Sequence, residues 1–144
     1  MNYKKFGNTY YVRMDKNDEM ISAILDICKK ENIKSATFNG IGGCKTAEIQ
    51  TFIPQQGTFK TEKLEGMLEL VSFTGNIVTD NEGNLHHHTH ALYSYVKNEK
   101  HFVLSGHIKS STVLYTAEIE LRPVTGGSIG YKKDAETGTG FWDL

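Results

Sequence analysis

The spacing of apolar residues predicts one helix near the start of the chain. Between residues 16 and 32, apolar side chains recur at the i, i+3, i+4 and i+7 positions of one helical face, namely Ile21, Ile24, Leu25 and Cys28. Asn17 is suited to cap the N-terminal end of this helix, and Asn32 is suited to the left-handed position after its C-terminal end. We therefore predict a single long helix in this segment.

Most of the remaining chain has the alternation and the β-branched and aromatic content that favour strands. A strand is predicted at residues 8–14, and strand-like runs follow the helix at residues 34–42, 45–53, 59–66, 67–78, 85–96, 101–108 and 112–122. Short turn sequences such as PQQG, DNEGN and KNEK separate several of these runs, as antiparallel hairpins require. The predicted fold class is α+β, a mostly antiparallel sheet of about seven strands with one long helix packed on it.

We predict that residues 1–144 form one domain, with a core at about residues 5–122 and an irregular tail at residues 123–144. The tail is rich in glycine but ends in the segment GFWDL. Phe141 and Trp142 would be costly to leave exposed to water. Two interpretations are open, because these rings can anchor the tail on the same chain or dock on a neighbouring subunit.

Composition and charge narrow the classes of function. No apolar run approaches the roughly 20 residues of a membrane span, and the N-terminus lacks the apolar core of a signal peptide. We therefore expect a cytoplasmic protein with no membrane partner. The net charge of −1 argues against tight binding to duplex DNA, which needs several lysines or arginines on one face. Cys28 and Cys44 are too few for a disulfide framework or a cysteine zinc site.

The glycine-rich segment FNGIGGCKT holds Gly40, Gly42 and Gly43. A dinucleotide-binding fingerprint would need a glycine at position 45 and a helix after it. Position 45 is instead Lys45, and the next segment is predicted to be a strand. A nucleotide site is therefore excluded, and a tight connection between strands or a β-bulge is the remaining interpretation.

Four of the six histidines lie within residues 86–90. On a strand, alternate side chains point to the same face, so His86, His88 and His90 share one face and His87 lies on the other. Neighbours on one face are roughly 6.5–7 Å apart along the strand. Two imidazoles at this spacing can converge on one ion with metal–nitrogen distances of about 2.0–2.1 Å.

A third ligand is available on the next strand. The KNEK turn is short, and an antiparallel pairing centred on it places His107 roughly opposite His90. We predict a metal site at His88, His90 and His107, and three histidines with an open fourth position are typical of a catalytic or ligand-exchanging metal. The alternative is a polar strand face with no ion. His101, at the turn, is expected to be solvated.

Two further residues are candidates for chemistry. Thr116, Glu118 and Glu120 alternate on one predicted strand face. Glu118 is therefore a candidate acid/base beside the metal, or an ordinary exposed glutamate. Arg13 is a candidate anchor for an anionic substrate, or a surface cation.

The order of these motifs resembles the plants-and-prokaryotes-conserved (PPC) domain family. The segments EKLEGMLELVSFTGN, GNLHHHTHALYS, SGHI and TAEIEL follow one another in the family's order, over roughly residues 5–122. Ser105 stands where the family commonly has a glycine, and His86 and His87 are not part of its pattern.

This resemblance implies a homotrimer with His88, His90 and His107 at the family's metal-ligand positions, and zinc or another divalent transition metal as the ion. It also implies a DNA-binding role, although the sequence has no basic RGRP-type segment. The wider fold is similar to that of α-acetolactate decarboxylase, a zinc enzyme, which implies chemistry instead.

Three hypotheses follow. The chain is a metal-binding homotrimer that acts in DNA binding or regulation, or a metal-dependent enzyme of lyase or hydrolase type that acts on a small anionic substrate. In the third hypothesis it is a scaffold in which the metal only stabilises the assembly.

Overall fold

The computed structural model describes residues 1–135 and 139–144. Most of these residues lie in β-strands, and a short helix follows the first two strands. The elements, in chain order, are β1 (Asn2–Phe6), β2 (Thr9–Asp15), α1 (Met20–Lys30), β3 (Ala36–Ile53), β4 (Thr58–Thr79), β5 (Leu85–Lys97), β6 (Lys100–Pro123), β7 (Gly130–Lys133) and β8 (Gly140–Asp143).

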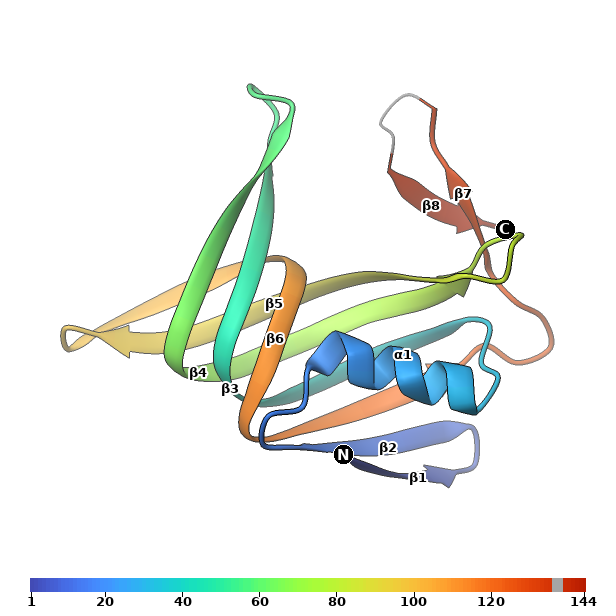
Figure 1. Ribbon diagram of the computed structural model, residues 1–144, viewed down its shortest axis with the longest axis horizontal. Helices are drawn as coiled ribbons and strands as arrows, with labels where there is room; N and C mark the ends of the chain where they lie inside the picture. Colours follow the sequence, from blue (N-terminus) through green and yellow to red (C-terminus); the bar gives the residue numbers. More distant parts are fainter. Residues whose placement is uncertain (136–138) are drawn as a thin grey trace.

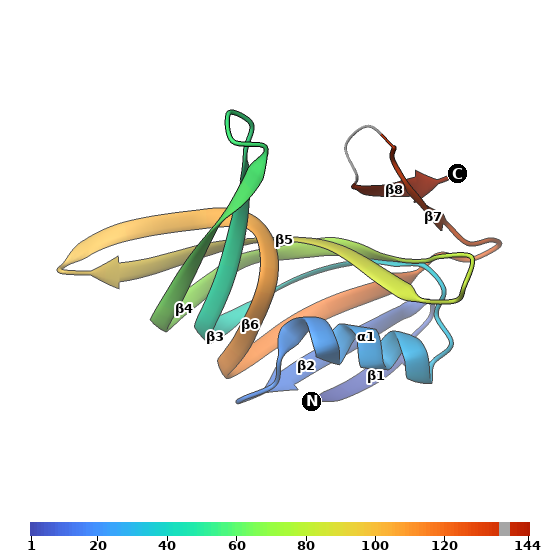
Figure 2. The same cartoon turned by 45° about the horizontal axis from the view of Figure 1, so that its top comes forward.

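The strands of the described residues form one eight-stranded sheet, in the order β1-β2-β6-β3-β4-β7-β8, with β5 paired to both β4 and β6. Because β3 also pairs with β4 and β6, these four long strands form a closed ring of neighbours. The sheet is mixed, since β4 and β7 run parallel where Thr79 pairs with Gly130. Figures 1 and 2 show the long strands bending, with α1 against the sheet and the β7–β8 hairpin at one end.

The predicted fold class, α+β with about seven mostly antiparallel strands and one long helix, is wrong. The fold is mostly β, with eight strands in a mixed sheet and one helix of 11 residues in the described part of the chain. The helix is short because Glu19 caps it, whereas the predicted cap, Asn17, has a left-handed φ of 75°. The predicted C-terminal end is confirmed, because Asn32 lies just beyond the helix with a left-handed φ of 53°.

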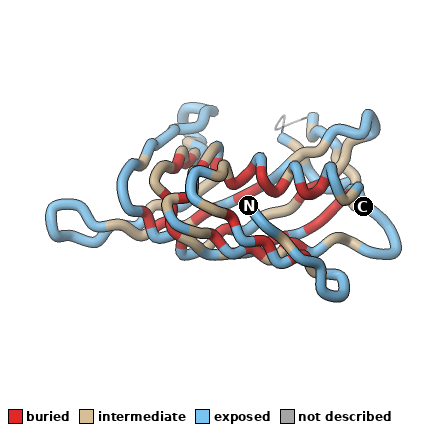
Figure 3. Tube along the Cα trace, turned by 60° about the horizontal axis from the view of Figure 1, so that its bottom comes forward, coloured by how far each residue is buried: buried red, intermediate tan, exposed pale blue. Residues whose placement is uncertain are grey.

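Helix α1 packs one apolar face against the sheet, and Figure 3 shows buried and exposed positions alternating along this helix. Its buried side chains are Met20, Ile21, Ala23, Ile24, Ile27 and Cys28. The Glu19 carboxylate accepts hydrogen bonds from the backbone N–H groups of Ser22, at 2.8 Å, and of Ser111 on β6, at 3.2 Å. The capping residue therefore also ties the helix to the sheet. No helix of the described residues has the length and apolar character needed to span a membrane.

Three pairs of predicted strands are single long strands, β3, β4 and β6. Strand β3 stays continuous through register shifts against β4, between Gly40 and Gly42 and between Cys44 and Thr46. Gly42 lies so close to β6 that a Cβ at this position would come within 2.6 Å of the Ala117 Cβ. The segment FNGIGGCKT is therefore a bulged strand, which confirms the structural interpretation of its glycines.

Candidate metal centre

His88, His90 and His107 come together on the sheet. The first two lie on β5, and the third lies on β6 directly opposite His90. The ligand atoms of the three side chains all lie within 4.8 Å of one another, with His88 and His90 exposed and His107 half-buried. The structure thus brings the three predicted residues together, and their binding of a metal stays a prediction.

The turn between β5 and β6 sets this register. Asn98 and Glu99 have positive φ angles of 51° and 60°, as a two-residue hairpin turn of type I′ requires. Lys97 pairs with Lys100, and the pairing continues without a register shift until His90 meets His107. The predicted pairing of these two histidines is confirmed.

The distances between the imidazoles suit a tetrahedral ion. The Nε2 atoms of His88 and His90 are 3.3 Å apart, and two nitrogens bound to one tetrahedral zinc are also separated by roughly 3.3 Å. The ring centroid of His107 lies 4.2 Å from that of His90 and 5.1 Å from that of His88. Three imidazoles are a donor set that suits zinc and other divalent transition metals.

The surroundings of His90 and His107 favour the neutral forms of these two imidazoles. Partial burial lowers the pKa of His90 and of His107 below the ordinary value, and the neighbouring imidazoles lower it further. A histidine must be neutral to bind a metal, so this shift makes the nitrogen lone pairs available at neutral pH.

The other three histidines have different surroundings. His86 Nε2 lies 2.8 Å from an Asp80 carboxylate oxygen, and its ring stacks on Tyr131 with a centroid distance of 4.0 Å. His87 forms a hydrogen bond of 3.2 Å with the hydroxyl of the threonine two residues further on. His101 is exposed, near the β5–β6 turn.

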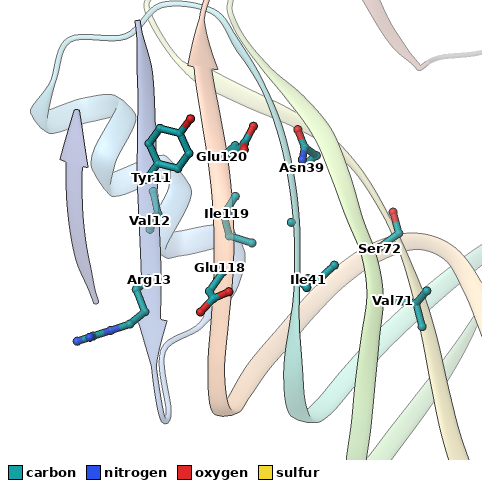
Figure 4. Close-up of a pocket in the computed structure, with 11 residues that line it drawn as sticks. Tyr11, Val12, Arg13, Asn39, Ile41, Val71, Ser72, Glu118, Ile119 and Glu120 are labelled. Atoms are coloured by element: carbon teal, nitrogen blue, oxygen red, sulfur yellow. The ribbon is translucent and has the colours of Figure 1, made fainter. Parts of the chain in front are cut away.

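Glu118 and Arg13 lie in a different cavity from the histidines. They are paired in register on the neighbouring strands β6 and β2, and they line an open cavity of about 630 Å³ together with Tyr11 and Asn39. Figure 4 shows the Arg13 side chain extended away from β6, and its Nε donates a hydrogen bond of 3.2 Å to Asp15. Within one chain, Glu118 therefore does not face the histidine cluster, and the catalytic role of both residues stays a prediction.

Sequence reasoning missed a second cavity, of about 820 Å³, that lies beside the histidines. His88 and His107 line it on the sheet side, and the β7–β8 hairpin lines it with Tyr131, Phe141 and Trp142. The aromatic end of the glycine-rich tail was the one signal in the sequence that pointed to this part of the site.

The tail docks on its own chain through Trp142. The indole Nε1 donates a hydrogen bond of 3.1 Å to the Asn76 side-chain oxygen on β4. This contact supports the interpretation in which the rings anchor the tail on the same chain. The rings are not fully covered, since Phe141 remains 48% and Trp142 43% exposed.

Solved structures share this fold along the whole chain. A plant- and prokaryote-conserved (PPC) protein from Pyrococcus horikoshii is 31% identical and has a TM-score of 0.81, over 99% of this chain and 95% of that one. A "putative dna binding protein" from Bacteroides thetaiotaomicron is 25% identical and has a TM-score of 0.88, over 99% and 96% of the two chains. A metal-containing protein from Archaeoglobus fulgidus is 22% identical and has a TM-score of 0.82, over 100% and 99% of the two chains.

A more distant likeness extends to a Staphylococcus aureus protein of unknown function that is similar to alpha-acetolactate decarboxylase. It is 13% identical with a TM-score of 0.56, over 83% of this chain and 54% of that one, and therefore shows a shared fold alone. A comparison with curated proteins found no match. The family model of the Plants and Prokaryotes Conserved (PCC) domain matches residues 1–125. With this match and the resemblance of its histidine and glycine motifs, the chain belongs to the plants-and-prokaryotes-conserved domain family.

Proposed function

We propose that this chain is a homotrimeric zinc-binding protein whose metal, held by His88, His90 and His107, keeps one coordination position open for a small ligand. The observation that carries the proposal is the approach of three ring nitrogens to within 4.8 Å of one another. Structural zinc sites usually fill all four positions with protein groups, whereas an open position allows ligand exchange. The metal-containing protein from Archaeoglobus fulgidus, which has the same fold, adds support.

Elemental analysis of untagged protein, combined with native mass spectrometry, tests this proposal. We expect one zinc per chain and an assembly of three times the 16.2 kDa of one chain. His88→Ala and His90→Ala should each lose the metal, because two imidazoles hold zinc too weakly. His101→Ala is the matched control, since His101 is exposed near the turn, and it should keep the metal. A wild-type protein that holds no zinc would contradict the proposal.

An exposed apolar surface supports self-association. Ile41 is 58%, Val71 48% and Tyr115 68% exposed, and the three residues line one open cavity on neighbouring strands β3, β4 and β6. Contiguous exposed apolar side chains of this kind mark interfaces between proteins. We expect Ile41→Glu to lower the native mass to that of a single chain while its circular dichroism spectrum stays unchanged. A trimer that is unaffected by this charge would place the interface elsewhere.

DNA binding is a second candidate function, which the name of the Bacteroides thetaiotaomicron relative favours. The charges of the chain give it little support. The two YKK segments, at residues 3–5 and 131–133, lie on β1 and on β7. Four other strands, β2, β6, β3 and β4, stand between β1 and β7 in the sheet order. Lys132 also forms an ion pair of 3.5 Å with Asp143. In a single chain the two segments therefore do not form one basic face.

A mobility-shift assay over a salt series tests DNA binding. Binding through phosphates predicts a dissociation constant of about 10⁻⁴–10⁻⁶ M or lower and an affinity that falls as salt rises. Weaker binding without a salt dependence would exclude this second function.

A further inference from the structure

The cavity beside the predicted metal centre has the size of a ligand site. Its volume is about 820 Å³, and pockets for small molecules usually have volumes of roughly 300–1,000 Å³. His88 and His107 form part of its lining, so an ion held by these residues would face into the cavity. The opposite wall comes from the C-terminal hairpin, which lies outside the 1–125 segment that the family model matches.

The hairpin side of the cavity is an aromatic wall formed by Tyr131, Phe141 and Trp142. Specific contacts hold Tyr131 and Trp142 in place. The Tyr131 ring stacks on the His86 ring at an interplanar angle of 7°, and His86 is itself hydrogen-bonded to Asp80. Gly140 gives the Tyr131 ring its space, because a Cβ at this position would overlap the ring. Trp142 is fixed separately, through its hydrogen bond to β4. The wall is therefore built from oriented rings rather than from a loose tail.

The charge of the site selects the kind of ligand. Among the described residues that line the cavity, none is an aspartate, a glutamate, a lysine or an arginine. Three neutral imidazoles leave both positive charges of a divalent ion without compensation. An anion that enters the cavity meets this charge between aromatic walls of low dielectric constant, where electrostatic attraction is stronger than in water.

We propose that this cavity binds a small planar organic anion, an aromatic or conjugated carboxylate, whose carboxylate takes the open position on the metal and whose apolar body lies against Trp142 and Tyr131. The inference rests on the proposed metal function. Carboxylate oxygens are ordinary zinc ligands, and aromatic rings attract one another in stacked or edge-to-face geometry beyond the area that they bury. Recognition by the wall therefore adds to the attraction by the metal.

Isothermal titration calorimetry of the zinc-loaded full chain with benzoate, acetate and benzyl alcohol tests the proposal. Benzoate should bind about tenfold more tightly than acetate, because one aromatic contact contributes approximately that factor. Benzyl alcohol, which has the ring without the negative charge, should bind more weakly than benzoate.

Substitutions in the aromatic wall distinguish its contribution to benzoate binding from that of the metal. Trp142→Ala should weaken benzoate binding to the level of acetate without changing the zinc content. Gly140→Ala, which displaces the Tyr131 ring, should also weaken benzoate binding while Trp142 is still present. Phe6→Ala is the matched control, since Phe6 is an exposed aromatic residue on β1, and it should leave benzoate binding unchanged.

The outcomes distinguish this inference from the proposed function. If benzoate and acetate bind equally to the zinc-loaded protein, or if Trp142→Ala has no effect, the aromatic wall is not a recognition surface. If benzyl alcohol binds as tightly as benzoate, the anion does not reach the metal. Absence of zinc from the wild type would overturn the proposed function itself. Trp142 is the only tryptophan in the sequence, so benzoate should also change the fluorescence of the wild type, and unchanged emission would contradict the inference.

Discussion

Substitution of His107 should remove the stability that the metal gives to the fold. Within the described residues, His107 is the one member of the histidine cluster that lies on β6, while His88 and His90 both lie on β5. His107→Ala therefore leaves two imidazoles on a single strand, fewer than the three protein ligands of the usual zinc sites. The metal then no longer links the two strands.

The magnitude of the effect follows from the binding of zinc to the folded chain alone. At a free zinc concentration one hundred times the dissociation constant, binding stabilises the folded state by about 2.7 kcal/mol. For a domain of 144 residues, each kcal/mol shifts the melting temperature by roughly 2–4 °C. We therefore expect zinc to raise the melting temperature of the wild type by roughly 5–11 °C and that of His107→Ala hardly at all.

Thermal unfolding followed by circular dichroism, with zinc and with a chelator, measures this difference. The protein concentration must be the same in all samples, because assembly also shifts the melting temperature. His101→Ala is the control on the same strand, and it should keep the full zinc effect because its side chain is exposed away from the cluster. The reasoning fails if chelation leaves the melting temperature of the wild type unchanged. It also fails if His101→Ala loses the zinc effect as His107→Ala does.

Three further predictions concern the fold. Two tyrosine hydroxyls donate to Glu31 and lower the pKa of its carboxyl, so its stabilising effect is present above the unfolded pKa of about 4.3 and is lost as the pH falls through the folded pKa. In a plot of the urea midpoint of unfolding against pH, Glu31→Gln should therefore reduce the decrease that the wild type shows at acid pH. An unchanged decrease would contradict this. Burial raises the pKa of the Cys28 thiol to about 12, so a thiol reagent should label Cys28 only after unfolding, and rapid labelling of the native protein would refute this. The buried Tyr93 hydroxyl donates to Ser111 at 2.8 Å, and Tyr93→Phe should lower the free energy of unfolding in urea by about 1–1.5 kcal/mol; no loss would show that the hydrogen bond contributes nothing.

The histidine cluster could be predicted because it depends on local rules. Alternation along β5 puts His88 and His90 on one face, and the two-residue turn fixes the partner of each residue on β6. No register shift separates this turn from the pair of His90 and His107. A single bulge in this hairpin would have moved His107 to the other face.

Bulges are the reason why the same rules failed on β3. Its glycines resemble the end of a strand in the sequence, because glycine commonly marks a turn. In the structure, Gly42 allows β3 to approach the Ala117 backbone of β6 while the strand continues. The helix length was misjudged for a related reason, since the left-handed backbone of Asn17 moved the cap to Glu19. In both places, a special backbone conformation decided where an element begins or ends.

The cavity beside the histidines depends on contacts that no local pattern encodes. Within the described residues, the hairpin that carries Trp142 has one strand pairing with the long strands, the parallel pair of Thr79 with Gly130. Trp142 reaches Asn76 across 66 residues of sequence, and periodicity within a segment carries no information about such a partner. The positions of the three histidines follow from the geometry of one hairpin. The aromatic wall, which would determine which small molecule binds the metal, follows from tertiary packing. The pattern of these histidines in the sequence therefore predicts a metal site, but it does not predict which small molecule that metal binds.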